Sequence, residues 1–392
     1  MPDIKAIQAE LRASKIDGWL FYDHHHRDSI ACRILGLDES AMATRRWFYF
    51  IPARGEPRKL AHRIEAGALD ALAGTKQLYS SWQELRTGLR KLLAGSRKIA
   101  MQYSPENNIP LIGLVDAGTV ELVRKLKKKV VTSADLVQKF EAVWTPEQLK
   151  SHLEAGRMVD RIVQGAFERA AAFVREGRPL SEAELQQWML DEFRASGLIT
   201  AEPPIAAVQP NNGNPHYEPK PGASSPIRAG DLLLLDVWAK LNRPGSVYYD
   251  VTWMGYLGGR VPDTYAKIFR IVREARDRAI EFVKESVARG RVIHGWEVDR
   301  AARAVIRKGG YAKNFVHRTG HSIGQEVHGN GANMDDLETR DERKIEPRTC
   351  FSIEPGIYLS QFGVRSEVNV YVGEREAQVT GAIQQEILPL LA

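Results

Sequence analysis

The spacing of apolar residues changes between helical and strand-like several times in the first third of the chain. Apolar positions three and four residues apart predict an amphipathic helix over residues 4–13. Short runs rich in aromatic and β-branched residues predict buried strands at 18–22, 46–51, 98–101 and 130–131. Because strands that alternate with helices pack as helix-covered sheets, a small α/β domain is expected here.

A change of pattern near residue 145 indicates a domain boundary. Thr145 can cap a helix that has Pro146 in its first turn, and the helical pattern then runs over residues 147–176. A second helix is expected after Ser181, which can form a capping box with Glu184. These two helices are predicted to open a second domain.

The second domain is predicted to combine groups of strands with long helices. Strands are expected at 204–208, 232–239, 247–256, 350–359 and 365–372, and long helices at 262–289 and 295–308. Since the strands come in groups with the helices between and around them, the expected fold class is α+β. The chain is thus divided into domains 1–144 and 145–392, in keeping with roughly 150 residues per domain.

The net charge of +6 does not indicate a nucleic-acid partner. Acidic residues are interspersed with the 55 lysines and arginines almost everywhere. The densest basic run, residues 124–129, contains no aromatic residues, and we interpret it as the solvated face of a helix. No nucleic acid is therefore expected to bind.

Cysteine content and hydropathy bear on the cellular compartment. Cys32 and Cys350 are far apart and lack the spacing of metal ligands, so buried thiols are expected instead of a disulfide framework. The N-terminus lacks the basic start and apolar core of a secretory signal. No apolar run approaches the ~20 residues that cross a bilayer. We expect a cytoplasmic protein without a membrane partner.

Four acidic residues interrupt predicted strands of the second domain. Asp236 ends the run of leucines at 232–235, and Asp250, Glu354 and Glu367 also have apolar neighbours. A single acid at a strand end is usually a turn cap or an ion-pair partner. Four in one domain are better explained by a bound cation, because isolated charges are costly to bury.

Histidines gather in one segment of the same domain. His317, His321 and His328 lie within residues 315–329, where three glycines disfavour a helix and predict an extended, turning stretch. A lone histidine is usually structural, whereas three in such a segment favour a functional site. His216 is weaker evidence by itself.

The consecutive histidines 24–26 are a conspicuous triplet that we discount as a metal site. Neighbouring side chains on one strand point to opposite faces, so they do not converge on an ion. The triplet also lies in the first domain, far along the sequence from the acidic residues.

Together these residues resemble the pita-bread metallopeptidases of family M24, which include creatinase, aminopeptidase P and prolidase. The stretches that carry the resemblance are Thr-Gly-His-Ser-Ile-Gly at 319–324, Ile-Glu-Pro-Gly-Ile-Tyr at 353–358 and Gly-Val-Arg-Ser-Glu at 363–367. The match covers residues 145–392, and residues 1–144 resemble the smaller creatinase-type N-terminal domain. The resemblance thus implies a pita-bread catalytic domain.

The resemblance also implies a pair of divalent metal ions. Its ligands, carried over by position, are Asp236, Asp250, His321, Glu354 and Glu367. Four carboxylates with one imidazole form an oxygen-rich set that favours Mn²⁺, with Co²⁺ and Zn²⁺ as alternatives.

Further catalytic residues follow from the same resemblance. His216 and His317 are expected to position the substrate, and His328 to polarise the scissile carbonyl. Glu354 is expected to carry a proton to the leaving nitrogen. Arg365 completes the catalytic set.

Arg365 is expected to orient Glu367 or Asp250 by a bidentate pairing. The chain also departs from the family pattern. Extra residues stand at 242–246, Arg318 occupies a position that is often glycine, and Val368 replaces a common acid. These departures bear on substrate preference more than on catalysis.

The activity that the resemblance implies is hydrolysis of the Xaa-Pro bond in dipeptides, by a homodimer that takes short proline-containing peptides. One alternative is an Xaa-Pro aminopeptidase that acts on longer peptides. Two others are a non-enzymatic binding module on the same fold and a hydrolase of another bond, such as a phosphotriester. Retention of all five metal ligands argues against the binding module.

Overall fold

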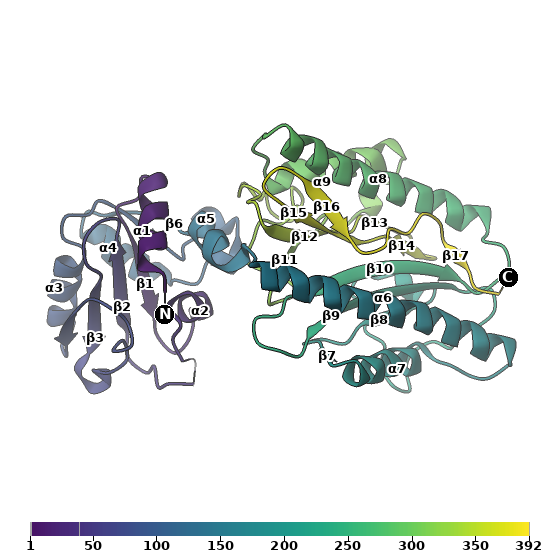
Figure 1. Cartoon of the computed structure of the whole chain (residues 1–392), viewed down its shortest axis with the longest axis horizontal. Helices are drawn as coiled ribbons and strands as arrows, with labels where there is room; N and C mark the ends of the chain where they lie inside the picture. The colour runs from purple at the N-terminus through teal and green to yellow at the C-terminus, as the bar shows by residue number, and fades with distance from the viewer. Residues whose placement is uncertain (1, 39, 392) are drawn as a thin grey trace. The chain divides into compact units, whose positions relative to one another are not determined.

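The computed structural model of the protein describes residues 2–38 and 40–391. The chain divides into two compact units, residues 1–141 and 142–392 (Figure 1). The helices of the first unit are α1 (Ile4–Ala13), α2 (Ser29–Leu35), α3 (Trp82–Leu92), α4 (Ala117–Lys125) and α5 (Ala134–Val137). Its strands are β1 (Gly18–Asp23), β2 (Trp47–Pro52), β3 (Arg58–His62), β4 (Thr75–Tyr79), β5 (Lys98–Met101) and β6 (Lys129–Thr132).

The first unit is built on one mixed sheet with the strand order β4-β3-β2-β1-β5-β6. The central strand β1 alternates two sets of buried side chains. Trp19 and Phe21 belong to one apolar cluster, and Leu20 and Tyr22 belong to another. Since both faces of the sheet are covered, this unit has the α/β architecture that the sequence predicts.

The local predictions for the first unit were incomplete. The four expected strands and the first helix are present, whereas β3, β4 and α2 to α5 were not predicted. The basic run 124–129 is not one helix face, because α4 ends at Lys125 and β6 begins at Lys129. The first residue of the run also packs on an aromatic ring: the guanidinium carbon of Arg124 lies 5.1 Å from the centre of the Tyr103 ring.

The histidine triplet does not lie on a strand, so the argument from strand alternation was wrong. Strand β1 ends at Asp23, and His25 and His26 adopt positive φ values of 63° and 53° in the following bend. The rings of His24 and His25 touch at 4.3 Å between centroids. The triplet belongs to the first unit, whereas the acidic residues belong to the second.

The second unit contains four long helices and eleven short strands among its described residues. The helices are α6 (Pro146–Arg175), α7 (Glu182–Ala195), α8 (Asp263–Ala288) and α9 (Gly295–Lys308). The strands are β7 (Leu198–Ile199), β8 (Ile205–Ala207), β9 (Leu232–Leu241), β10 (Tyr249–Tyr256), β11 (Ser322–Ile323), β12 (Thr349–Ile353), β13 (Gly356–Tyr358), β14 (Gly363–Arg365), β15 (Val368–Val372), β16 (Ala377–Thr380) and β17 (Leu388–Pro389).

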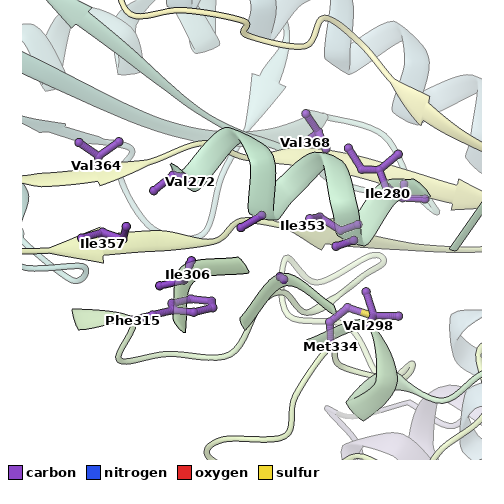
Figure 2. Close-up of a cluster of buried hydrophobic side chains, with 14 of the residues drawn as sticks. Val272, Ile280, Val298, Ile306, Phe315, Met334, Ile353, Ile357, Val364 and Val368 are labelled. Carbon is purple, nitrogen blue, oxygen red and sulfur yellow. The ribbon is translucent and has the colours of Figure 1, made fainter. Parts of the chain in front are cut away.

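Two helix pairs enclose the strands of the second unit (Figure 1). Helices α6 and α7 pack beside the sheet that contains β9 and β10, and α8 and α9 cover the sheet β11-β12-β15-β16. Each pair buries its own apolar cluster. Figure 2 shows part of the cluster beneath α8 and α9, where Ile353 of β12 and Val368 of β15 lie among the helical side chains. This is the α+β arrangement predicted from the sequence.

The first helix of the second unit begins where its capping residues predict. The Thr145 side chain accepts from the backbone N–H of Gln148 at 3.2 Å, and the Gln148 side chain accepts from the N–H of Thr145 at 2.9 Å. Ser181 and Glu184 form the same type of box at the start of α7. Gly156 lets α6 approach β10 closely, since a Cβ there would stand 2.8 Å from the Tyr249 ring.

The two cysteines and the helices agree with two further expectations. Cys32 and Cys350 are both buried, and no disulfide joins them. Within residues 2–38 and 40–391, every helix is too short or too polar to cross a membrane.

His152 on α6 ties three elements together through two hydrogen bonds. Its Nδ1 lies 2.6 Å from the Tyr248 carbonyl oxygen, and its Nε2 lies 2.6 Å from the Thr380 hydroxyl oxygen. A carbonyl can only accept, so Nδ1 donates and the neutral Nε2 accepts from the hydroxyl. Burial lowers the pKa of His152 to about 4, because the charged imidazolium would be desolvated.

This histidine should make the fold sensitive to acid. The unfolded chain takes up the proton near pH 6.5 and the folded chain only near pH 4, so stability is full above pH 6.5 and falls as the pH drops towards 4. The expected loss between pH 7.5 and pH 5 is about 2 kcal/mol from this residue. His152→Gln should lack that part of the loss in urea unfolding of the metal-free protein.

The matched control is His25→Gln, which removes an exposed histidine of the first unit. It should lose as much stability between the two pH values as the unsubstituted protein. An equal acid sensitivity of His152→Gln and the unsubstituted protein would refute the assignment.

Candidate metal centre

Two aspartates share one face of the β9–β10 hairpin. The register pairs Asp236 with Thr252 and Asp250 with Trp238. Residues two apart on a strand point to the same side, so Asp236 and Asp250 lie diagonally across the hairpin on one face. The extra residues at 242–246 lie in the connecting turn and leave this register continuous.

Two glutamates are placed by the neighbouring ladder. The last residue pair of the β12–β15 ladder joins Ile353 to Val368. Glu354 follows Ile353 and Glu367 precedes Val368, so the two glutamates lie at the same end of the antiparallel ladder. Val368, which replaces a common acid of the family, is 1% exposed within the apolar cluster under α8 and α9. Neighbouring residues on a strand face opposite ways, which is why Val368 points away from the acids.

His321 reaches the same place because a glycine precedes it. A Cβ on Gly320 would stand 1.9 Å from the backbone oxygen of Ser352, so only glycine lets this segment lie against β12. The His321 Nε2 is then 3.5 Å from an oxygen of Asp250 and 3.5 Å from an oxygen of Glu354. One ligand atom each from Asp250, His321 and Glu367 lie within 4.8 Å of one another.

Hydroxyl and amide side chains hold the carboxylates in position. The Thr252 Oγ1 lies 3.1 Å from Asp236 Oδ1 and 2.8 Å from Glu367 Oε2. A hydroxyl has one proton, so it can serve only one of these oxygens at a time. The Asn369 side chain accepts a hydrogen bond from the backbone N–H of Asp250 and donates one to its carbonyl oxygen.

The buried charge of this cluster is neutralised only in part by the described residues, since Arg365 pairs with Asp236 alone. Asp250 Oδ1 and Glu367 Oε1 are buried and have no hydrogen-bond partner in the described part of the chain. Burial, and then the other carboxylates, raise the pKa of Asp250 and of Glu367 well above their usual range. Burial also lowers the pKa of His321, which keeps a neutral ring nitrogen available. Excess negative charge beside a neutral imidazole fits divalent cations.

All nine residues predicted for the site line one cavity of about 550 Å³. They are His216, Asp236, Asp250, His317, His321, His328, Glu354, Arg365 and Glu367. The residues come from six segments of the second unit, so the tertiary fold brings them together. None of the nine lies elsewhere.

The three histidines outside the ligand set differ in their surroundings. His328 is exposed at the cavity wall, and its ring lies 4.4 Å from the His321 ring, whose charge, followed by partial desolvation, lowers the pKa of His328 to about 3. His317 is half-buried, and desolvation of its ring lowers its pKa to about 3 as well. His216 is exposed on a loop at the cavity wall.

His317 uses both ring nitrogens within the protein. Its Nδ1 lies 2.7 Å from the Arg318 carbonyl oxygen, and its Nε2 lies 2.8 Å from the Tyr358 hydroxyl. The carbonyl requires the proton on Nδ1, so Tyr358 donates to Nε2. Tyr358 also lies 3.3 Å from Arg365 Nη1.

The expected partner of Arg365 was wrong. Its Nη2 pairs with Asp236, and its Nε donates to the Thr252 hydroxyl at 2.9 Å, so it forms no bidentate pair with Glu367 or Asp250. Arg365 ends β14, and its side chain reaches Asp236 on β9 and Thr252 on β10.

The sequence reasoning missed two residues that organise the site. Tyr358 ends the stretch at 353–358 that carries the family resemblance, so its position beside Glu354 was a usable signal. Thr252 sits among aromatic strand residues and carries no signal by itself. Its role becomes visible only through its contacts with Asp236 and Glu367.

Known proteins resemble the chain along most of its length. The "Probable dipeptidase PepE" of Mycobacterium tuberculosis is 26% identical over 344 residues, which cover 86% of this chain and 84% of that protein. The "Xaa-Pro dipeptidase" of Pyrococcus furiosus is 26% identical over 299 residues, which cover 73% of this chain and 78% of that protein.

Solved structures share the fold. Dipeptidase PepE from Mycobacterium ulcerans superposes with a TM-score of 0.71 at 22% identity, covering 99% of this chain and 96% of the other. A prolidase from Thermococcus sibiricus superposes with a TM-score of 0.64 at 23% identity and 98% coverage of both chains. The pita-bread fold expected from the sequence is therefore confirmed.

The model of metallopeptidase family M24 matches residues 154–374 of the chain. This region contains all nine predicted site residues of the cavity. Because the match spans more than half of the 392 residues, the chain belongs to metallopeptidase family M24.

Proposed function

We propose that this protein hydrolyses Xaa-Pro dipeptides with the help of two divalent metal ions, Mn²⁺ in the working enzyme. The observation that carries the proposal is the group of buried, under-neutralised carboxylates around His321 in a cavity large enough for a dipeptide. The names of the relatives, dipeptidase and Xaa-Pro dipeptidase, support the choice of substrate.

Five side chains would hold the metal ions: Asp236, Asp250, His321, Glu354 and Glu367. Their oxygen-rich chemistry supports Mn²⁺. When bound, the ions would lower the pKa of water and polarise the scissile carbonyl.

The remaining roles belong to the chain's own residues. Burial raises the pKa of Glu354, so this carboxylate can hold a proton and pass it to the proline nitrogen as the C–N bond breaks. His328 stays neutral at working pH and can donate an N–H to the carbonyl oxygen on which negative charge develops. His216, on the exposed cavity wall, can contact the substrate directly.

Tyr358 connects two groups of the site. Its hydroxyl donates to His317 and approaches Arg365, which in turn is paired with Asp236. Since both nitrogens of His317 have partners, we assign His317 and Tyr358 to positioning Arg365 and the Asp236 carboxylate.

Metal and substrate dependence should follow directly. The metal-free protein should not release proline from alanyl-proline, and added Mn²⁺ should restore the release. The dipeptide should be preferred to alanyl-prolyl-alanine. A preference for the tripeptide would indicate an Xaa-Pro aminopeptidase instead, and cleavage of neither peptide with Mn²⁺ bound would refute the proposal.

Asp250→Asn should have opposite effects on stability with and without metal. The raised pKa of Asp250 means that its charge destabilises the metal-free fold, and more so as the pH rises from its unfolded value. In thermal unfolding at pH 7.5, the metal-free variant should therefore be more stable than the metal-free parent. With Mn²⁺ the order should reverse, because the variant should lose about 100-fold or more in Mn²⁺ affinity.

Asp191→Asn provides the control for this experiment. It removes an exposed carboxylate from α7, far in sequence from the site. Asp191→Asn should match the parent both in metal-free thermal stability and in Mn²⁺ affinity. A metal-free Asp250→Asn protein less stable than the parent would show that the charge of Asp250 does not destabilise the metal-free fold.

Tyr358→Phe should lower kcat for alanyl-proline by about 10-fold while Mn²⁺ content stays full. The change removes hydrogen bonds to His317 and Arg365, each worth about 1 kcal/mol, without touching a metal ligand. Tyr265→Phe, which alters a tyrosine outside the cavity, should keep full activity. Unchanged kcat in Tyr358→Phe would remove Tyr358 from the positioning network.

A further inference from the structure

The charges that line the active-site cavity are unequal. Among the described lining residues there are seven carboxylates and two arginines, Arg318 and Arg365. Arg365 is committed to Asp236, with which it forms a buried ion pair. Arg318 is therefore the lining cation that the metal-ligand framework does not use.

The guanidinium of Arg318 has no partner within the described part of the protein. The residue's backbone is anchored, since its N–H donates to Glu338 at 3.1 Å and its carbonyl accepts from His317 at 2.7 Å. Its side chain forms no hydrogen bond and no ion pair with residues 2–38 or 40–391, although it is partly buried. An anchored backbone with an unpaired charged head is suited to a ligand that arrives from solution.

The guanidinium also lies close to the reacting centre. It lines the same cavity as His321 and His328. Arg318 stands three residues before His321 in the same extended segment. An anionic group held by Arg318 would thus lie beside the metal ligand and the carbonyl-polarising histidine.

The proposed substrate offers one such anion. In an Xaa-Pro dipeptide the terminal carboxylate is attached to the proline Cα, two bonds from the nitrogen of the scissile amide. In a longer peptide a neutral amide takes its place. A guanidinium that pairs with this carboxylate would therefore distinguish dipeptides from longer substrates.

We propose that Arg318 binds the C-terminal carboxylate of the substrate and thereby selects dipeptides. This inference rests on the proposed function and adds the residue that determines substrate length. Three lining acids outside the metal-ligand set, Glu202, Glu218 and Glu338, would repel the carboxylate, and the charge of Arg318 offsets this repulsion.

The test compares alanyl-proline with alanyl-prolinamide, which differ only in the terminal charge. With Mn²⁺ bound, the parent enzyme should prefer the acid. Arg318→Gln should lower kcat/KM for the acid by about 30-fold, as for loss of a charge-assisted hydrogen bond, and change that for the amide by less than about 2-fold. Arg318→Lys should keep most of the preference because it keeps the charge.

Binding supplies a second readout that is independent of turnover. In calorimetric titration of the Mn²⁺-loaded protein, the product proline should bind the parent more tightly than prolinamide does. Arg318→Gln should bind the two alike. Arg243→Ala removes the same charge from the turn at 242–246, outside the cavity, and should behave as the parent does in both assays.

The outcomes separate the two proposals. If the parent cleaves neither compound, the proposed function fails, and the assignment of Arg318 fails with it. If the parent cleaves alanyl-proline but Arg318→Gln loses the same factor on acid and amide, the assignment of Arg318 alone is overturned. Circular dichroism and Mn²⁺ content show whether each variant keeps the fold. If Arg318→Gln does not fold, the assignment is tested with Arg318→Lys, which should keep the preference for the acid over the amide.

Discussion

The structure depends on the burial of negative charge that the protein does not itself neutralise. Four carboxylates on adjacent strands surround one imidazole, and a single guanidinium, from Arg365, is paired with one of them. Removing charges from water costs several kcal/mol each unless they are paired, so such a cluster opposes folding. It persists because divalent ions can bind there and because a large apolar framework holds the strands in place.

That framework explains why the acids converge. Strands β9, β10, β12 and β15 bury apolar side chains against the helix pairs on their outer faces, and Ile353 and Val368 are among the residues packed there. Alternation along a strand then directs the neighbouring acids, Glu354 and Glu367, inwards. The apolar burial of the two clusters thus offsets the electrostatic cost of the centre.

Around the carboxylates, the cavity combines neutral histidines with one cation, Arg318, that is unpaired among residues 2–38 and 40–391. Desolvation of His317 and the charge of His321 beside His328 lower the pKa of both histidines, so near neutral pH both rings are neutral and can form hydrogen bonds but cannot serve as general acids. Arg318 adds a positive charge close to them. In the functions we propose, metal binding, carbonyl polarisation and recognition of the substrate's end belong to different side chains of one cavity.

The sequence by itself determined the helix starts at Thr145 and Ser181, most strands of the second unit and nine of the residues that line the cavity. Capping boxes and apolar periods are local, and the family resemblance lies in short contiguous stretches. Tertiary structure alone decided that Arg365 pairs with Asp236, 129 residues away, and that Thr252 lies between two carboxylates. Such contacts depend on which strands the packing of the helices brings together, and no local pattern records that choice.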